Sequence, residues 1–417
     1  MGFLRGGETT TACYGVADAR TGEPVGLGTR FSVGSLTKTM VATVIAHLAE
    51  AGRLSLDDPV AAHLPELPSR GWVEQATLRD LLANRSGLPL RSALEFGFDL
   101  HANADDGALS SLVAEVGSDS QPLDFWSYSN VGWCLLGRVI ETATGMTWED
   151  AMERDLVDAA GMKETSFKPW TANPRRVSGH KVGPNGPVAL EPLMARAYGP
   201  AGTSAVSTIT DLLRFAALHL SEPSLAGLRV VHEKDVSIYA WLDAWCLGWA
   251  QFDCDGEQVW GWDGLINGER SFLRIIPQRQ AAIAMLTNAS TGRALYRALF
   301  PEVMRAASRM RMPSLRLDPS PEGAGDLTRF AGVYAWPDRR VEVTASSNGL
   351  LITTEDHAMQ ALPLSDRVFL IDANDPDNPT VTFGSFDAAG RPHALYVMLW
   401  GLPRVGDATE AGVQSRR

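Results

Sequence analysis

The chain has 417 residues, of which 45% are hydrophobic and 21% are charged, as in a globular protein and unlike a disordered or fibrous one. Its net charge of −12 and the lack of any Lys- or Arg-rich block argue against a nucleic-acid partner. No apolar run reaches the roughly 18 residues of a membrane span, and the first residues lack the pattern of a signal peptide. We therefore expect a cytoplasmic protein with no membrane partner.

The cysteines are scattered and show neither C-x-x-C nor Cys/His ligand spacing; they are Cys13, Cys134, Cys246 and Cys254. This pattern favours reduced thiols over a zinc site or a disulfide framework. We expect no metal and no cofactor.

The first predicted elements are a strand at residues 13–18 (CYGVAD) and a turn in ARTGEP. From Ser35 the apolar residues recur at helical spacing, with Gly52 as the expected C-cap. Residues 55–200 mix helical segments with long Pro- and Gly-rich loops, and another helix is predicted at 131–144, ended by Gly145.

A helix is predicted at 210–220, followed by a hairpin of strands 271–276 and 281–287, joined by PQRQ, and by a helix at 293–310. Residues 1–307 form the first predicted domain, and residues 308–326, rich in Pro, Gly and Asp, a linker. Short strands with turns between them fill 327–405 and predict a small antiparallel β-barrel or sandwich. The polar residues 406–417 are predicted to be disordered.

A serine and a lysine three residues apart stand where the first helix begins, in FSVGSLTKTM. Helical spacing places Ser35 and Lys38 on one face, with the hydroxyl near the positive end of the helix dipole. Such a lysine can take the hydroxyl proton if burial or neighbours lower its pKa. A second Ser-x-x-Lys, Ser178 to Lys181, lies in turn-rich sequence, and we interpret it as chance.

Two further motifs supply polar groups. Tyr128-Ser129-Asn130 stands directly before the helix predicted at 131–144 and offers a second group that can move a proton; alternatively it is a turn with an Asn cap. Trp262-Asp263-Gly264 precedes the predicted hairpin and fits a strand edge against which a substrate lies.

These segments, together with LLANRSGLP, AAGMKETSF and GPAGTSAVSTITDLLRFA, resemble the serine β-lactamase and penicillin-binding-protein superfamily in its class C-like branch. That branch includes lactamases, D-aminopeptidases, family VIII carboxylesterases and acyltransferases. The resemblance covers nearly all of residues 10–307, in the family's order. It implies an α/β (α+β) fold with a central antiparallel sheet flanked by helices and an all-helical region, followed by the C-terminal β-domain, a lipocalin-like barrel or a sandwich.

The resemblance also implies roles for individual residues. Ser35 would be the nucleophile that forms an acyl-enzyme, and Lys38 and Tyr128 would share the general-base and general-acid work. Asn130 would orient Lys38 and touch the acyl side chain of the substrate. The backbone N–H groups of Ser35 and Leu265 would form the oxyanion hole.

The sequence departs from the family pattern at three places. The third motif usually begins with Lys or His, whereas Trp262-Asp263-Gly264 has no cation, and Asn84 replaces a usual His. The sequence also does not show the helix that normally precedes the first strand, so either the true start lies upstream or the fold has a reduced edge. An indole at 262 would favour a neutral, partly apolar ester or amide, unless Trp262 points into the core, and Asp263 would repel an anion if it faced the site.

We therefore expect an enzyme that transfers an acyl group from a small ester or amide through Ser35 to water (esterase) or to an amine or alcohol (transacylase). A D-aminopeptidase or β-lactamase is the alternative within enzymes, and a catalytically inactive binding protein is the alternative from another class. The β-domain would be an accessory cap or a wall of the substrate site. The sequence leaves the acyl donor, the acceptor and the oligomeric state open.

Overall fold

The computed structural model describes residues 1–67, 75–88, 107–115, 125–168, 175–191, 195–234, 242–312, 318–320, 325–336, 339–375, 379–397 and 399–407. Two compact units divide the chain. The first comprises Met1–Pro122, Ser129–Glu233 and Trp245–Pro313, and the second comprises Leu123–Tyr128, Lys234–Ala244 and Ser314–Arg417. The disorder predicted for the tail falls, from residue 408 onward, outside the described residues.

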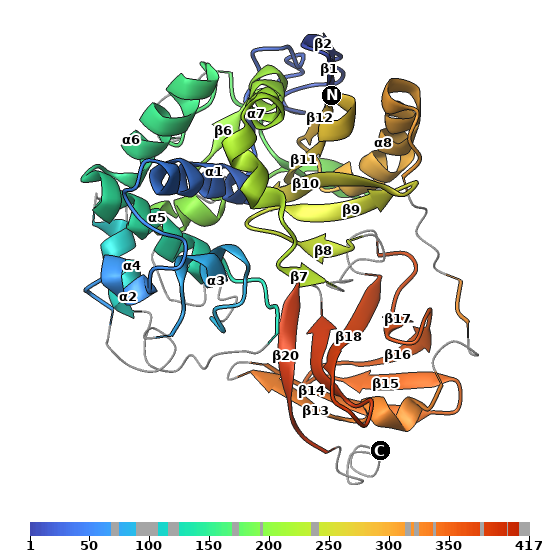
Figure 1. The fold of residues 1–417 in the computed structure, drawn as a ribbon. Coiled ribbons are helices and arrows are strands. Elements are labelled where there is room, and N and C mark those ends of the chain that lie inside the picture. Colours follow the sequence, from blue (N-terminus) through green and yellow to red (C-terminus); the bar gives the residue numbers. More distant parts are fainter. Residues whose placement is uncertain are drawn as a thin grey trace. The chain divides into compact units, whose positions relative to one another are not determined.

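Within the described residues, an eight-stranded sheet runs in the order β2-β1-β12-β11-β10-β9-β8-β7 (Figure 1). Its strands are β1 (Gly2–Arg5), β2 (Glu8–Thr11), β7 (Glu233–Lys234), β8 (Ala244–Trp245), β9 (Ala250–Cys254), β10 (Glu257–Ile266), β11 (Glu269–Ile276) and β12 (Ala281–Thr287). Two small ribbons accompany it, made by β3 (Phe31–Ser32) with β6 (Val206–Ser207) and by β4 (His180–Gly183) with β5 (Gly186–Ala189). Every residue of β11 is buried, so the sheet is covered on both faces at its centre.

The predicted hairpin of residues 271–276 and 281–287 is confirmed as the antiparallel pair β11 and β12, with β11 beginning two residues earlier. The strand predicted at 13–18 is wrong. The chain instead forms β1 and β2 around Gly6 and Gly7, whose positive φ values of 56° and 87° suit a tight turn. Residues 13–18 contain only an isolated bridge between Val16 and Pro24.

Helices cover both faces of this sheet (Figure 1). The α-helices of the described residues are α1 (Thr37–Glu50), α2 (Val60–His63), α3 (Leu78–Leu82), α4 (Ala108–Glu115), α5 (Asn130–Thr144), α6 (Trp148–Met152), α7 (Ile209–Ser221) and α8 (Gly292–Ser308). The helices predicted at 131–144, 210–220 and 293–310 are thereby confirmed, and Gly145, at φ 71°, is the C-cap of α5. Leu213 of α7 packs on β1, whereas Tyr296 of α8 stacks on Phe272 of β11 at 4.2 Å.

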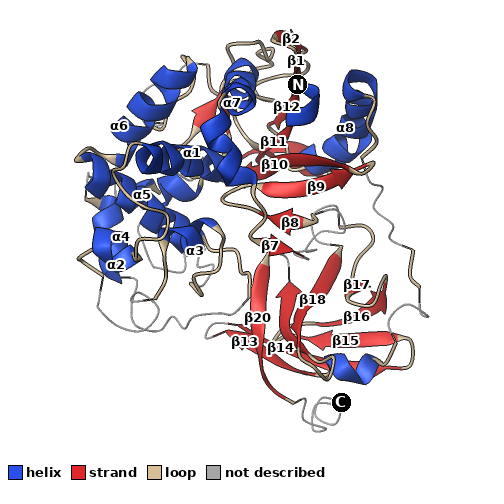
Figure 2. Ribbon diagram, viewed as in Figure 1, coloured by secondary structure: helices blue, strands red, loops and turns tan. Residues whose placement is uncertain are grey.

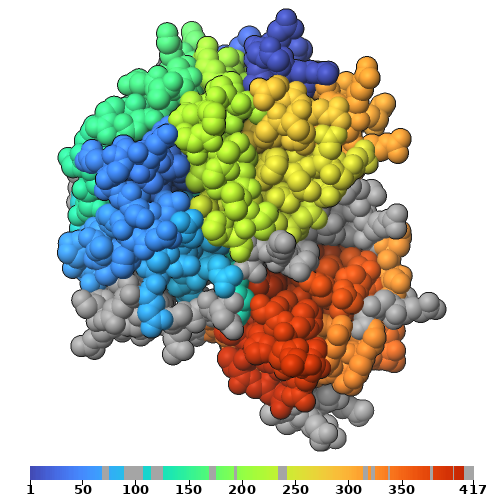
Figure 3. All heavy atoms as spheres, viewed as in Figure 1, coloured from blue at the N-terminus to red at the C-terminus, as the bar shows by residue number. Residues whose placement is uncertain are grey.

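Segments that are distant in the sequence share one surface of this unit. Figure 3 shows the α1 and α2 region in blue, α7 with the following 3₁₀ helix Pro223–Arg229 in yellow-green, and β9 in yellow. Both α1 and α7 contact that 3₁₀ helix. In the described part of the chain, no helix has the length and apolar character needed to cross a membrane.

The second unit contains a closed antiparallel β-barrel, so the open choice between barrel and sandwich is decided (Figure 2). Its strands are β13 (Gly332–Trp336), β14 (Arg339–Ser346), β15 (Gly349–Thr353), β16 (Ala358–Pro363), β17 (Val368–Leu370), β18 (Thr380–Phe386), β19 (Pro392–Val397) and β20 (Trp400–Gly406). Pairing of β13 with β20 closes the barrel and removes free sheet edges. Phe330, Tyr334, Phe369 and Phe383 pack together inside it.

Candidate active site

Ser35 lies in a 3₁₀ turn, Gly34–Leu36, that leads directly into α1. The preceding residue, Gly34, has a positive φ of 53°, which most side chains disfavour. Val33 is fixed on both sides, because its N–H donates to the Ala205 carbonyl at 3.0 Å and its carbonyl accepts from Ser271 Oγ at 2.6 Å. The backbone that carries Ser35 is therefore held by the neighbouring segments and not by α1 alone.

Lys38 lies one turn further on and reaches back to the serine. Its Nζ donates to Ser35 Oγ at 3.2 Å and also to the Ala201 carbonyl. The side chain is completely buried, and this burial lowers the pKa of Lys38 from its usual 10.5 to about 7. A large fraction of the lysine is then a neutral amine near neutral pH, which is the form that accepts a proton from the hydroxyl.

Cys134 of α5 is a neighbour of Lys38 that the sequence pattern did not indicate. Burial raises the pKa of its thiol to about 12, so the thiol is neutral near pH 7 and supplies no counter-charge. Cys134 and the Ala201 carbonyl are thus two of the groups that lie beside the buried Lys38 amine.

Backbones approach one another closely around Ser35, at positions where only glycine fits. A Cβ on Gly34 would lie 2.6 Å from the backbone nitrogen of Leu265, and a Cβ on Gly264 would lie 1.8 Å from the Val33 carbonyl oxygen. A Cβ on Gly202 would lie 2.8 Å from the nitrogen of Ser35. The turn before α1 therefore packs directly on β10 where the two amides of the predicted oxyanion hole stand.

Trp262 and Asp263 point to opposite faces of β10, because successive side chains of a strand alternate. The indole of Trp262 is 5% exposed and packs edge-on against Trp245, with ring centroids 4.7 Å apart. Gly264, two residues on, shares this face and contacts the Val33 backbone, so Trp262 is on the Ser35 side of the sheet. Its predicted contact with a substrate stays a prediction.

Asp263 is paired with two arginines within the fold. Its carboxylate accepts from Arg274 at 2.7 Å and from Arg293 of α8 at 2.6 Å, and these two arginines lower the pKa of Asp263 despite its burial. This cluster lies on the α8 face, opposite Ser35. Its charge is therefore already neutralised within the fold, and its part in substrate binding stays a prediction.

The Tyr128-Ser129-Asn130 motif begins α5. The hydroxyl of Ser129, the N-cap, accepts from the N–H of Gly132 at 3.1 Å, and Asn130 is the first helical residue. Asn84, which stands where the family usually has His, accepts from the N–H of Ser129 at 3.4 Å and from Trp133 Nε1 at 3.1 Å. It thus holds the start of α5, while the contacts predicted for Asn130 stay predictions.

Tyr128 itself belongs to the second unit. Its N–H donates to the Leu399 carbonyl at 3.2 Å, and Ser127 Oγ accepts from the N–H of Gly401 at 3.3 Å. Phe125 packs edge-on against Tyr396 of β19, with centroids 6.2 Å apart. Residues 125–128, which the sequence analysis placed in the first domain, are therefore held by the β19–β20 hairpin.

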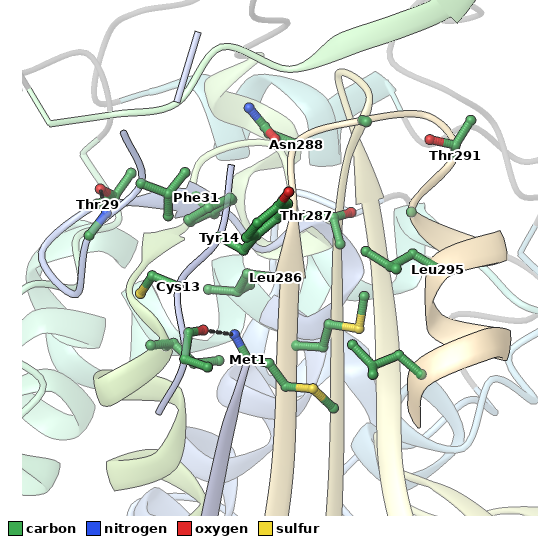
Figure 4. A pocket seen from close by; sticks show the side chains of 18 of the residues that line it. Met1, Cys13, Tyr14, Thr29, Phe31, Leu286, Thr287, Asn288, Thr291 and Leu295 are labelled. Atoms are coloured by element: carbon green, nitrogen blue, oxygen red, sulfur yellow. Dashed lines mark hydrogen bonds between the residues drawn. The ribbon is translucent and has the colours of Figure 1, made fainter. Parts of the chain in front are cut away.

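Three further features are candidates for a site: the second Ser-x-x-Lys motif, the cavity of the first unit, and clusters of metal-ligating side chains. Ser178 donates to Asp18 at 3.0 Å, whereas Lys181 is exposed on β4, so the second Ser-x-x-Lys does not bring its side chains together. A mainly apolar cavity of about 460 Å³ contains none of the predicted site residues; Figure 4 shows Tyr14 over the end of β12, beside Leu286 and Thr287. Among the described residues, no group of three or more His, Cys, Asp or Glu side chains is arranged to hold a metal ion.

Comparison with known proteins agrees with this arrangement. The family model described as Beta-lactamase matches residues 1–307. Penicillin-binding protein 4 of Amycolatopsis lactamdurans is 30% identical over 350 residues, which span 79% of this chain and 90% of that protein. The crystal structure of SurE superposes with a TM-score of 0.79 at 26% identity, covering 97% of this chain and 94% of that one, and SurE has also been solved with D-Leu. The octameric penicillin-binding protein homologue from Pyrococcus abyssi shares the fold, with a TM-score of 0.63 at 18% identity over 96% of this chain and 94% of that one.

Proposed function

Because the chain belongs to the beta-lactamase family, we propose that it is a serine acyl-transfer enzyme that forms an acyl-Ser35 intermediate from a small ester or amide. The observation that carries this proposal is the pairing of Ser35 with a completely buried lysine 3.2 Å away, whose pKa is lowered to about 7. A lysine with a purely structural role would have no reason to be kept dry beside a hydroxyl.

In the proposed acylation, neutral Lys38 accepts the hydroxyl proton while Ser35 Oγ bonds to the substrate carbonyl carbon. The N–H groups of Ser35 and Leu265 stabilise the oxyanion that results. The intermediate then collapses, the bond to the leaving alcohol or amine breaks, and that group takes a proton from Lys38 or Tyr128. Water, an amine or an alcohol then attacks the acyl carbon and gives up a proton to Lys38 or Tyr128. The bond between the acyl carbon and Ser35 Oγ breaks, and Oγ takes a proton from the same group, which restores the Ser35 hydroxyl.

The chemistry of the site favours a neutral acyl donor. Trp262 replaces the cation that would hold a substrate carboxylate, and an indole offers one N–H donor and a large apolar face. The same replacement disfavours the alternative of a β-lactamase or D-aminopeptidase that acts on anionic substrates.

The acceptor is proposed to include amines. SurE, which is similar over nearly the whole chain, has been solved with D-Leu, so an amine acceptor with D configuration is a candidate here. Adding D-leucine amide or L-leucine amide to an ester reaction would divert the acyl group from water to the amine, and the D form should divert more.

Labelling with a fluorophosphonate, followed by mass spectrometry of the modified peptide, tests the nucleophile. The wild type should carry the label on Ser35, and Ser35→Ala should carry none and lose at least about 10³-fold in p-nitrophenyl acetate hydrolysis. Absence of label in the folded wild type would support the inactive binding protein instead.

A further inference from the structure

The buried carboxylate of Glu269 lies beside Ser32 of β3, the strand that leads to Ser35. None of the sequence motifs indicated it. Glu269 is the first residue of β11 and is 2% exposed. Its Oε2 accepts from the backbone N–H of Ser32 at 2.6 Å, and its Oε1 accepts from Ser32 Oγ at 2.8 Å. Both carboxylate oxygens of Glu269 thus accept hydrogen bonds from Ser32, three residues before Ser35.

Arg176 is the third member of this cluster, but it only weakly neutralises the charge of the Glu269 carboxylate. Its Nη2 donates to Ser32 Oγ at 2.8 Å and lies 4.0 Å from Glu269 Oε1. Elsewhere in the same unit, Glu149 binds Arg196 through both carboxylate oxygens, at 2.7 and 3.1 Å. Glu269 lacks such a fork, and burial raises its pKa to about 7 against the opposing effects of Arg176 and Ser32.

The two segments that Glu269 joins are those that carry the amides of the proposed oxyanion hole. Ser32 precedes Ser35 by three residues, and Glu269 follows Leu265 by four, across the Asn267-Gly268 turn of the β10–β11 hairpin. Both turn residues have positive φ values, 51° and 78°, so the turn is tight and couples the positions of Leu265 and Glu269 closely. A shift of Ser32 relative to β11 would change the spacing of the Ser35 and Leu265 amides.

We propose that Glu269 is a positioning residue that sets the oxyanion hole by fixing Ser32 to the β10–β11 hairpin. The inference rests on the proposed function, because it assumes that Ser35 is acylated. Burying a carboxylate is costly, and an apolar pair would hold two segments together at lower cost. Two directed hydrogen bonds give what apolar packing does not, a defined distance and orientation.

The test measures the rate at which a fluorophosphonate labels Ser35 in wild type, Glu269→Gln and Glu269→Ala. In this reaction the Ser35 Oγ–P bond forms, the P–F bond breaks, fluoride leaves, and the hydroxyl proton passes to Lys38. The amide of Glu269→Gln can still accept from the Ser32 N–H, whereas Glu269→Ala can accept from neither donor. We expect the maximal labelling rate to fall about 10-fold in the first and about 100-fold in the second, with reagent affinity changed less than about 3-fold.

Glu141→Gln is the matched control, since Glu141 is also buried and accepts from a backbone N–H, that of Trp148, at 3.1 Å. It should lower the unfolding temperature and leave the maximal labelling rate unchanged. If Glu269→Gln and Glu269→Ala label Ser35 as fast as wild type, the positioning role is wrong and the proposed function stands. If wild type is not labelled at Ser35, the proposed function itself fails. Should Glu269→Ala not fold, the isosteric Glu269→Gln decides alone.

Discussion

Lys38 Nζ lies 3.2 Å from Ser35 Oγ, and it reaches that position from within a completely buried environment. The distance provides the path for the proton, and the burial provides the lowered pKa of about 7 that makes the amine a base. Neither property is useful without the other, since a solvated lysine would remain protonated at neutral pH.

The pH dependence of the reaction should report Lys38. Because the neutral amine is the active form, kcat/KM for p-nitrophenyl acetate should fall about tenfold per pH unit below about pH 7 and level off above it. Glu269 also has a pKa of about 7, so Glu269→Gln is the control and should keep this acid limb. A profile that is flat from pH 5 to 8 would remove Lys38 from the role of base.

Replacing Lys38 by Met should inactivate the enzyme and stabilise the fold. Between about pH 7 and 10.5 the unfolded chain binds the Lys38 proton and the folded chain does not, so stability increases with pH in this window. Below about pH 7 both states carry the proton and the cost of burying the charge is fully felt. Lys38→Met should therefore raise the free energy of unfolding by roughly 1–3 kcal/mol at pH 6, and by less at pH 9. Urea denaturation at the two pH values measures this, and an equal or reversed difference would contradict it.

The close approach at Gly202 predicts a sharp loss of activity. A Cβ there would lie 2.5 Å from the Gly34 carbonyl carbon and 2.8 Å from the Ser35 nitrogen. Gly202→Ala should displace the Ser35 amide and lower kcat about 100-fold or more. Gly186→Ala is the control, since Gly186 has a comparable positive φ of 100° but no atom within 4 Å of the added Cβ. If Gly202→Ala keeps the kcat of Gly186→Ala and of wild type, the close contact at Gly202 does not position the Ser35 amide.

Trp262 is predicted to set the preference for neutral substrates. Wild type should hydrolyse short p-nitrophenyl esters with higher kcat/KM than an anionic chromogenic cephalosporin, and Trp262→His should shift this ratio about tenfold towards the cephalosporin. Trp260→His, two residues away on the same face of β10, should leave the ratio unchanged. If the wild type prefers the cephalosporin, or Trp262→His keeps the ratio, the indole contributes only its packing against Trp245.

Residues 125–128 are held by the barrel, and we therefore predict that the second unit affects catalysis. A Cβ on Gly401 would lie 2.6 Å from the Phe125 ring and 2.9 Å from the Trp126 carbonyl oxygen. Gly401→Ala should displace residues 125–127 and with them Tyr128, lowering kcat about tenfold with little change in KM. Gly406→Ala, on the same strand with no atom within 4 Å of the new Cβ, should behave as wild type. Unchanged kcat in Gly401→Ala would make the barrel an accessory cap.

Local sequence patterns predicted the helices well and one turn poorly. Gly145 ends α5 as the predicted left-handed C-cap, a signal that acts within a few residues, whereas the N-cap is Ser129 and not the Asn that the sequence offered. The Asn267-Gly268 pair is an equally local signal, typical of a two-residue hairpin. It forms the β10–β11 turn, but no hairpin was predicted from it. The strand misplaced at 13–18 has a different cause, since β1 exists through its pairing with β12, about 280 residues away.

The sequence by itself determined that Ser35 and Lys38 meet, because three residues of helix bring two side chains to one face whatever surrounds them. It also determined the family, since motifs in a fixed order are a property of the chain. Only the tertiary structure decided that Lys38 is buried away from water, that Asp263 forms ion pairs with Arg274 and Arg293, and that Glu269 binds Ser32. Burial and long-range pairing depend on which distant segments pack together, and residue spacing along the chain carries no record of that.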